Sequence, residues 1–407
     1  MNPTASPATD APPAQPYPPV PAGAPPAQPY PPVPAVPAAA RPARAAVRVR
    51  HDDLLDFVAA VFTTRGLAPE RAREAAAALC YGDLVGMTSH GLANLTRLYL
   101  PLFDEGRADP LAEPSVLADR GAAVLLDADR ALGLWAAGLA MEIAAGRAST
   151  YGVGMVSVRG GTHFGCAGHH ALRAVEYGMV GVIAGNCGRQ RIARPPGGAV
   201  AMLGTNPISV AAPAGGHPPF VLDMSTTAMP TGRVRQAARH GAELPEGVLA
   251  GDDGAPVTDA AAFDEGRAHL LWLGGQAGQY KGFGLGVAVE VLAALVSGAG
   301  LGAHPDAHDG DGGPSGRDDD IGFLALAVAP GALREGVEGD AATMFGALLG
   351  CPPADPASPV SYPGWHEHRR AEEHRRSGVP LGPDLYDELA ALAAATGLDA
   401  PAPVVAR

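Results

Sequence analysis

The spacing of apolar residues along the chain alternates between a helical period and short continuous runs. Apolar residues recur every three or four positions over about 54–64, 69–84 and 92–99, which predicts three helices. Further helices are predicted at 135–149, 166–177 and 384–396, with a buried helix at 283–299. Short apolar runs predict strands at 124–126, 155–158, 180–183, 208–211, 220–222 and 323–328. Strands mixed with helices throughout indicate one interleaved α/β body from about residue 47 onward.

Two segments depart from this pattern. Residues 1–45 are rich in proline and alanine, and the sequence at 11–22 recurs identically at 24–35. Such a stretch lacks amide donors and cannot bury a core, so it predicts a disordered tail, with a docking motif for a proline-reading domain as the alternative. Residues 302–320 are polar and rich in glycine, which predicts a flexible, solvated insertion. Its start resembles a calcium loop, yet Pro314 and Asp320 stand where that loop needs glycine and glutamate.

Composition narrows the classes of partner. The chain has 407 residues, of which 47% are hydrophobic and 17% charged, and its net charge is −13. An acidic protein of this kind is poorly suited to bind nucleic acid or anionic membranes, so a small molecule is the expected partner. The four cysteines lie far apart and form no Cys-x-x-Cys pair. Glycines and Glu290 interrupt the longest apolar stretch and no signal peptide is visible, so a cytoplasmic location is expected.

Two histidines lie in turns that suit proton transfer. Ser89 and His90 precede Gly91 and a predicted helix, so His90 can face a cleft. His163 lies in a glycine-flanked turn between a predicted strand and a predicted helix. Taken singly, each histidine is more often structural than catalytic. Gly-Thr-Asn-Pro at 204–207 and Asp-Met-Ser-Thr-Thr at 223–227 add further hydrogen-bonding groups.

The common nucleotide and metal motifs do not occur in the sequence. No Gly-x-Gly-x-x-Gly follows a predicted strand, and there is no Walker phosphate loop. The histidines at 366 and 368 do not have His-Glu-x-x-His spacing, so no metal site is predicted. The chain contains 28 arginines but a single lysine, Lys281, in the run Tyr-Lys-Gly-Phe-Gly. An ammonium is compact and can point at a phosphate or carbonyl oxygen, which favours a ligand contact over the alternative of a leftover surface lysine.

The order of these motifs carries a resemblance. Along the chain follow Ser-His-Gly at 89–91, Thr-His-Phe-Gly at 162–165, Gly-Thr-Asn-Pro at 204–207, Asp-Met-Ser-Thr-Thr at 223–227, Tyr-Lys-Gly-Phe-Gly at 280–284 and Tyr-Pro-Gly at 362–364. From about residue 47 to the C-terminus, the sequence resembles the malate/L-lactate dehydrogenase family of the second type. That family also includes ureidoglycolate and sulfolactate dehydrogenases and a piperideine-2-carboxylate reductase. The tail and the 302–320 insertion lie outside the resemblance.

The resemblance implies a fold and a cofactor. The expected fold is α/β but distinct from the Rossmann fold, with helical segments at both ends of the chain. Residues 46–125 and 330–407 are expected to form a helical part for substrate binding and dimerisation, and 126–329 a cofactor-binding α/β part. NAD or NADP is the expected cofactor, and a homodimer is the expected assembly.

The resemblance also implies roles for individual residues. His163 matches the histidine that exchanges a proton with the substrate oxygen, and Ser89 and His90 match catalytic-pocket residues. The positions that match cofactor contacts are Asp223, Met224, Ser225, Lys281, Gly282, Pro363, Gly364 and Trp365, with Asn206 of the Gly-Thr-Asn-Pro turn.

Three departures from the family pattern concern the substrate. The arginine expected four residues after His90 is Asn94, which cannot make a bidentate charged contact, and Arg97 is the candidate substitute. The tyrosine expected eight residues after His90 is Leu98. The segment 186–198 is about two residues longer than the family pattern.

This longer segment carries three arginines, Arg189, Arg191 and Arg194. A solvated basic loop is one interpretation. The other is a pocket in which they bind a more anionic substrate or the 2′-phosphate of NADP.

The sequence therefore predicts an NAD(P)-dependent oxidoreductase that transfers a hydride between nicotinamide and a small 2-hydroxy or 2-oxo acid, with His163 as acid and base. One alternative is reduction of a C=N bond in a biosynthetic pathway. Another is a redox-silent member recruited for non-redox chemistry or binding, which the change to Asn94 and the altered loop motivate. A scaffold that acts through the tail is a weaker alternative, because every motif lies in the globular body.

Overall fold

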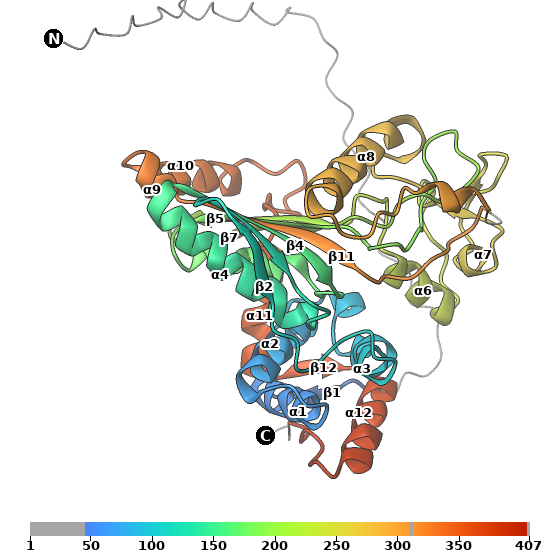
Figure 1. The fold of residues 1–407 in the computed structure, drawn as a ribbon, viewed down its shortest axis with the longest axis horizontal. Coiled ribbons are helices and arrows are strands. Elements are labelled where there is room, and N and C mark those ends of the chain that lie inside the picture. Colours follow the sequence, from blue (N-terminus) through green and yellow to red (C-terminus); the bar gives the residue numbers. More distant parts are fainter. Residues whose placement is uncertain (1–44, 310–311, 405–407) are drawn as a thin grey trace, which may run out of the picture. The chain divides into compact units, whose positions relative to one another are not determined.

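A seven-stranded mixed sheet forms the centre of the fold (Figure 1). Its strands are antiparallel to their neighbours except for the parallel pair β3–β4. In spatial order they are β2 (Ser115–Asp119), β3 (Ala123–Asp127), β4 (Val153–Gly161), β11 (Ile321–Val328), β5 (Val180–Gly185), β6 (Ile208–Ala214) and β7 (His217–Met224). The computed structural model describes residues 45–309 and 312–404, so the predicted tail at 1–45 lies outside the described residues apart from Ala45.

Helices cover both faces of this sheet. Gly154 and Gly181 lie opposite Ala327 in the register of β11, and a Cβ on either glycine would collide with a carbonyl of α4 (Gly133–Tyr151) or α5 (Ala167–Val175). Gly322 is separated from Ala327 by an odd number of positions along β11. A Cβ on Gly322 would collide with the carbonyl of Ala293 in the π-helical turn η3 (Val291–Leu295), which follows α8 (Gly275–Glu290). Since successive strand residues face opposite sides, α4 and α5 cover one face and α8 with η3 covers the other.

The two ends of the described chain meet in a helical part. Strand β1 (Val47–Val49) pairs with β12 (Val379–Leu381), and α11 (Trp365–Ser377) packs on α2 (Pro69–Val85). Helix α1 (His51–Thr64) buries Leu54, Val58 and Phe62 at helical spacing against α2, and α12 (Pro383–Thr396) closes the chain.

A smaller unit lies beside the sheet. Helix α6 (Thr231–His240) packs on α7 (Ala261–Asp264) and on a short sheet of β10 (His269–Leu270), β8 (Leu249–Ala250) and β9 (Pro256–Val257). This unit has a hydrophobic core of its own around Val234, Leu249 and Phe263. The remaining helices are α3 (Leu100–Asp104), α9 (Pro330–Leu333) and α10 (Val337–Leu349), with the 3-10 turns η1 (Thr88–His90) and η4 (Pro305–Asp309) and the π-helical turn η2 (Leu95–Tyr99).

The predicted α/β fold is confirmed, and the structure corrects three details. The helix expected at 283–299 begins already at Gly275, and it is not buried all round, because Val287, Val291 and Leu295 are exposed on one face. The third helix, expected at 92–99, is present and runs from 93 to 104, but its middle, Leu95–Tyr99, is π-helical. Residues 115–125, expected in the helical part, form β2 and most of β3 in the sheet, since their alternating side chains pack there. No helix in the described part of the chain is long and apolar enough to cross a membrane.

Candidate active site

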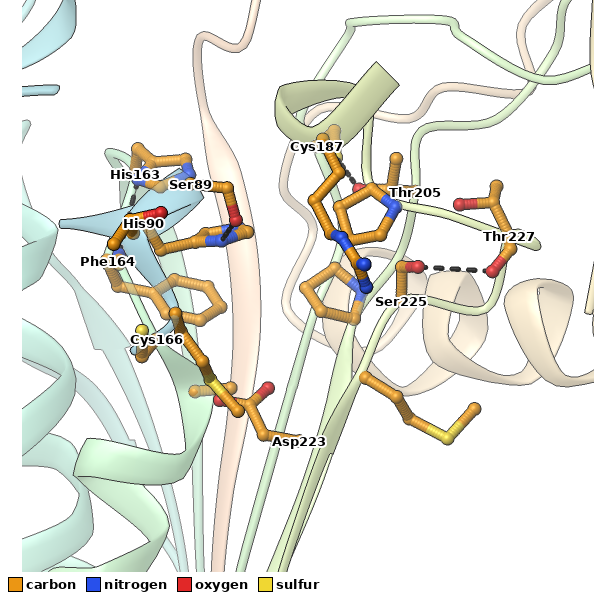
Figure 2. Close-up of a pocket in the computed structure, with 18 of the residues that line it drawn as sticks. Ser89, His90, His163, Phe164, Cys166, Cys187, Thr205, Asp223, Ser225 and Thr227 are labelled. Carbon is orange, nitrogen blue, oxygen red and sulfur yellow. Dashed lines mark hydrogen bonds between the residues drawn. The ribbon is translucent and has the colours of Figure 1, made fainter. Parts of the chain in front are cut away.

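A cavity of about 720 Å³ opens where β4 and β5 end and β11 begins. Both strands pair antiparallel with β11 from opposite sides, so the last residue of β4 lies opposite Ile321 and that of β5 opposite Phe323, at the same end of the strands. Figure 2 shows two groups of side chains that face each other across the cavity, with Asp223 below them. One group is Ser89, His90, His163, Phe164 and Cys166, and the other is Cys187, Thr205, Ser225 and Thr227.

His163 lies in the turn that follows β4, and contacts to its Nδ1 nitrogen hold the ring in place. Its Nδ1 lies 2.8 Å from the hydroxyl of Tyr99 and accepts the backbone N–H of Gly165 at 3.2 Å. With Nδ1 engaged in this way, Nε2 is the nitrogen left for a substrate. Burial lowers the pKa of His163, and Asp318 raises it in part.

The turn itself is fixed by short backbone and side-chain contacts. Thr162 Oγ1 accepts the N–H of Gly133 at 2.8 Å, and His170 Nε2 bonds the carbonyl of Phe164 at 2.8 Å. Gly165 has a φ of 77°, which few residues other than glycine adopt, and it lets the chain reverse into α5. Bonds within the turn, together with those from Gly133, Tyr99 and α5, therefore fix the direction of His163.

Tyr99 is a pocket partner that the sequence did not reveal. It is fully buried, and burial raises the pKa of its hydroxyl well above the ordinary value, so the phenol stays neutral. The expected tyrosine position was occupied by Leu98, one residue earlier. A π-helical turn holds one residue more than an α-helical turn, and Tyr99 ends such a turn, which accounts for the shift by one position.

His90 and Ser89 lie beside His163. The rings of His90 and His163 are stacked with their centroids 6.0 Å apart, and Ser89 Oγ lies 3.0 Å from His90 Nδ1. Burial, and then the neighbouring His163, lower the pKa of His90 to about 4, so it is neutral at pH 7. The predicted substrate residue Asn94 does not line the cavity; its amide donates to the carbonyl of Ser89 at 2.9 Å.

Asp223, Met224 and Ser225 all line the cavity, at the end of β7. The Asp223 carboxylate accepts the N–H of Gly168 in α5 at 2.7 Å, while burial raises its pKa to about 6. Ser225 Oγ donates to the carbonyl of Thr227 at 3.1 Å. These three residues, expected to contact cofactor, therefore share one cavity with His163.

The three arginines of the 186–198 segment do not reach the cavity. Arg191 is buried, donates to the carbonyl of Gly302 at 2.9 Å and pairs with Asp306. Arg194 donates to the carbonyl of Gly312 at 3.1 Å and pairs with Asp252 at 2.6 Å, and Arg189 is exposed. From this segment the cavity is lined instead by Asn186, Cys187 and Gln190. Partners in the insertion and the small unit thus attract Arg191 and Arg194, and the predicted anion pocket is not formed there.

Arg97 also lies outside the cavity. Its guanidinium is 3.3 Å from the carboxylate of Glu388 in α12, and half of its side chain is exposed. The structure therefore does not bring Arg97 to the cavity, because its side chain pairs with α12, and its role toward a substrate stays a prediction.

Asn206 is structural rather than a cavity residue. Its amide donates to Glu290 at 2.8 Å and to the carbonyl of Gly286 at 3.0 Å, and its side chain is fully buried. Glu290 also accepts from Asn186 at 3.2 Å and from the N–H of Gly302 at 2.8 Å. This buried network joins α8 to three loops beside the cavity, and it explains the carboxylate within the longest apolar stretch.

Lys281 and Gly282 lie on α8 outside the lining of the cavity. Lys281 is exposed, and its Nζ lies 5.8 Å from the centre of the Tyr280 ring. Gly282 packs against the backbone of Leu273, where a Cβ would approach to 2.5 Å. Leu273 does line the cavity, so Gly282 shapes the site from behind.

Pro363, Gly364 and Trp365 also lie behind the wall of the cavity. The carbonyl of Pro363 accepts the N–H of Val221 in β7, two residues before Asp223. Trp365 makes an edge contact with Tyr362. From α11 the cavity is lined by Glu367 and Arg370 instead.

Besides Glu367 and Arg370, the cavity contains two charged residues, Arg233 and Asp318, that the sequence motifs did not indicate. Arg233 lies in the first turn of α6, next to Gly232, where a Cβ would lie 3.2 Å from Cβ of Ser89. Within residues 45–309 and 312–404, no carboxylate pairs with its guanidinium. Asp318 comes from the insertion. Neither belongs to a recognisable motif, so no sequence signal distinguished them from surface charges.

Comparison with known proteins agrees with this geometry. The family model described as malate/L-lactate dehydrogenase matches residues 49–390. The chain belongs to this family. It is accordingly a dehydrogenase or reductase, and the predicted family and enzyme class are confirmed.

Individual relatives cover most of the chain. The malate dehydrogenase of Pyrococcus abyssi is 36% identical over 255 residues, which are 62% of this chain and 69% of the relative. A Δ1-pyrroline-2-carboxylate/Δ1-piperideine-2-carboxylate reductase of Pseudomonas putida is 32% identical over 285 residues, 70% of this chain and 80% of the relative. The crystal structure of malate dehydrogenase from Entamoeba histolytica superposes with a TM-score of 0.79 at 25% identity, and covers 88% of this chain and all of that chain.

Proposed function

We propose that this chain transfers a hydride between a nicotinamide cofactor, NAD or NADP, and a small 2-hydroxy or 2-oxo acid. The observation that carries the proposal is the His163 arrangement: Tyr99 and the N–H of Gly165 occupy Nδ1, and the ring lies in the cavity wall. A histidine held by one nitrogen presents the other to a substrate oxygen in a fixed direction. The likeness to dehydrogenases supports the same reaction class.

The residues of the cavity fit the nicotinamide end of such a cofactor. Pro207, Met224 and Leu273 supply apolar surface, and Thr205, Ser225 and Thr227 supply hydroxyl groups suited to an amide. When bound, the nicotinamide supplies or accepts the hydride. We expect Asp223, Met224 and Ser225 to hold it, with Lys281 and the 363–365 segment near the remainder of the cofactor.

The chain's own residues manage one proton. In reduction, protonated His163 gives the proton on Nε2 to the oxygen of the carbonyl as that carbon receives the hydride, and the imidazole is left neutral. The hydroxyl of Tyr99 accepts from Nδ1 in the tautomer that carries its proton there and leaves Nε2 free, whereas the bond from the Gly165 N–H to Nδ1 belongs to the other tautomer, with the proton on Nε2. In oxidation the same atoms move in reverse.

Arg233 is the residue we assign to the substrate carboxylate. It is a cation of the cavity with no carboxylate partner among the described residues, and α6 places it beside Ser89. A guanidinium binds a carboxylate through two parallel hydrogen bonds, so it can replace the arginine that Asn94 lacks. Arg233→Leu should raise the KM for a 2-oxo acid by about 10–100-fold. Arg239→Leu, at the other end of α6, is the matched control and should leave it unchanged.

Replacement of His163 tests the proposed function directly. His163→Asn should lower kcat by about 10²–10⁴-fold, because the proton donor is lost, while NADH or NADPH fluorescence still reports cofactor binding. His240→Asn, outside the cavity, should keep full activity. A fully active His163→Asn would refute the assignment. Cofactor binding without turnover of any 2-oxo acid or cyclic imine by the unaltered chain would instead support the redox-silent alternative.

One observation favours a second substrate class, the cyclic imino acids. Asp223 and Asp318 place carboxylates in the cavity that contains His163, and a carboxylate stabilises a cationic C=N group. The likeness to a piperideine-2-carboxylate reductase supports this candidate. Comparison of kcat/KM for a cyclic imine and for its open 2-oxo acid analogue distinguishes the two. We also expect the protein to be a homodimer and to be cytoplasmic. Light scattering would test the assembly.

A further inference from the structure

The 302–320 insertion ends directly at the candidate active site. Arg107, just after α3, bonds two of its carboxylates: Nε donates to Asp319 at 2.6 Å, and a terminal nitrogen donates to Asp318. The next residue, Asp320, accepts the N–H of Gly160 at 3.0 Å. Gly160 lies at the end of β4, directly before the turn that carries His163, so the end of the insertion is attached there and is not a free solvated loop.

Asp318 is the member of this group that lines the cavity together with His163. Only 17% of its side chain is exposed, and the same holds for Arg107. Two carboxylates against one guanidinium leave a net negative charge beside the cavity, while Glu105, 3.7 Å from Arg107, is itself offset by Arg317 at 3.9 Å. A negative charge in a partly desolvated wall acts more strongly than one at the surface.

Around His163, the other groups carry little charge at neutral pH. His90 stacks on it, Tyr99 bonds Nδ1, and Cys166 lies in the same wall. Burial keeps each of these three groups in its neutral form. The charged groups elsewhere in the lining are Asp223, Arg233, Glu367 and Arg370.

We propose that Asp318 is an active-site carboxylate, delivered by the insertion, which stabilises the protonated form of His163 and so favours the reductive direction. Burial by itself works against protonation of His163, and Asp318 is the group that opposes this effect. The inference rests on the proposed function for its direction: the imidazolium gives the proton to the carbonyl oxygen during reduction, whereas oxidation needs the neutral imidazole.

The test compares Asp318→Asn with Asp319→Asn. Both variants remove one carboxylate from Arg107, but only Asp318 lines the cavity. NMR titration of His163 in the chain without cofactor should show its pKa lower by about half to one pH unit in Asp318→Asn and unchanged in Asp319→Asn. An unchanged titration in Asp318→Asn, or an equal shift in Asp319→Asn, would overturn the proposal.

Activity supplies the second measurement. In Asp318→Asn, the alkaline limb of reduction and the acid limb of oxidation should both move to lower pH, because His163 loses its proton earlier. Reduction at pH 7 should slow by about 3–10-fold at most, while oxidation near pH 6 becomes faster. A variant that slows both directions equally at every pH would indicate a merely structural role and contradict the proposal. The titration remains informative even if His163→Asn shows that the proposed function is wrong.

The Arg107→Gln variant is the control that distinguishes an effect of charge from displacement of the insertion. Loss of the guanidinium leaves Asp318 unneutralised, so the His163 pKa should rise rather than fall if the insertion stays in place. Falls in both Arg107→Gln and Asp318→Asn would mean that displacement of the insertion, and not charge, moves His163, and would also overturn the proposal.

Discussion

Two segments leave the sheet on either side of β11, and they use their polar residues in opposite ways. The turn after β4 directs His163 into the cavity, whereas the longer segment after β5 turns Arg191 and Arg194 away from it. The first segment is short: Gly165 bonds His163 within it, and Thr162 is anchored to Gly133 at the start of α4. The second is long, and its direction is set by carboxylates and carbonyls remote in sequence. A short turn therefore reveals its chemistry in the sequence, and a long loop does not.

The largest expected effect concerns the buried network at the base of the second segment. Glu290→Ala leaves the amides of Asn186 and Asn206 without their carboxylate partner in the protein interior. The free energy of unfolding should fall by about 3–5 kcal/mol, measured by denaturant unfolding. Glu290→Gln, which keeps an acceptor, is the control and should lose less. Equal stability of Glu290→Ala and the unaltered chain would show that the segment is held by other contacts.

The next effect tests the first segment. Tyr99→Phe removes the hydroxyl 2.8 Å from His163 Nδ1 and keeps the buried ring. We expect kcat to fall by about 10-fold, because the useful tautomer loses its partner, with little change in KM or stability. Leu98→Ala, on the adjacent and partly buried residue, separates loss of packing from loss of the hydroxyl. An unaffected kcat in Tyr99→Phe would show that Gly165 alone orients the ring.

A smaller effect distinguishes structure from binding in the second segment. Arg191→Met should lower the free energy of unfolding by about 1–3 kcal/mol, since the carbonyl of Gly302 loses its donor inside the protein. The KM for a 2-oxo acid and the Kd for NADPH should stay unchanged, because Arg191 does not line the cavity. A rise in either constant with unchanged stability would restore the anion-pocket hypothesis.

The smallest effect belongs to Arg189, which is exposed. Arg189→Ala should change stability by less than about 0.5 kcal/mol and leave steady-state constants as they are. This variant serves as the baseline for Arg191→Met in the same segment, and any clear kinetic change would show that Arg189 contacts a ligand.

Much of the fold was predictable because its elements repeat simple patterns. The apolar runs at 155–158, 180–183 and 323–328 lie in β4, β5 and β11, and the helical spacing of Leu54, Val58 and Phe62 gives α1. The exposed face of α8 was not predictable, since an all-apolar helix reads as buried whether or not another surface covers it. The π-helical turn was missed for a related reason: one extra residue in a turn leaves no mark on the apolar spacing.

In the candidate site, too, some residues could be predicted from the sequence and others could not. His163, His90, Ser89 and the 223–225 stretch could be placed from local motifs, and all of them line the cavity. Asn94 and Arg97 were assigned by position and Asn206 by its motif, and each bonds to a protein partner instead. Tyr99, Arg233 and Asp318 were missed: Tyr99 bonds His163 from an irregular turn, and Arg233 and Asp318 reach the cavity from a separate small unit and an insertion.

The sequence by itself determined the family, the α/β class and the histidine of the turn after β4, since these depend on residues near one another in the chain. Only the tertiary structure decided which charges face the substrate. A guanidinium or carboxylate turns toward the partner that best offsets its desolvation, and that partner lies far away in sequence. Arg191 thus turned to the insertion, and Asp318 turned to Arg107 at the edge of the cavity.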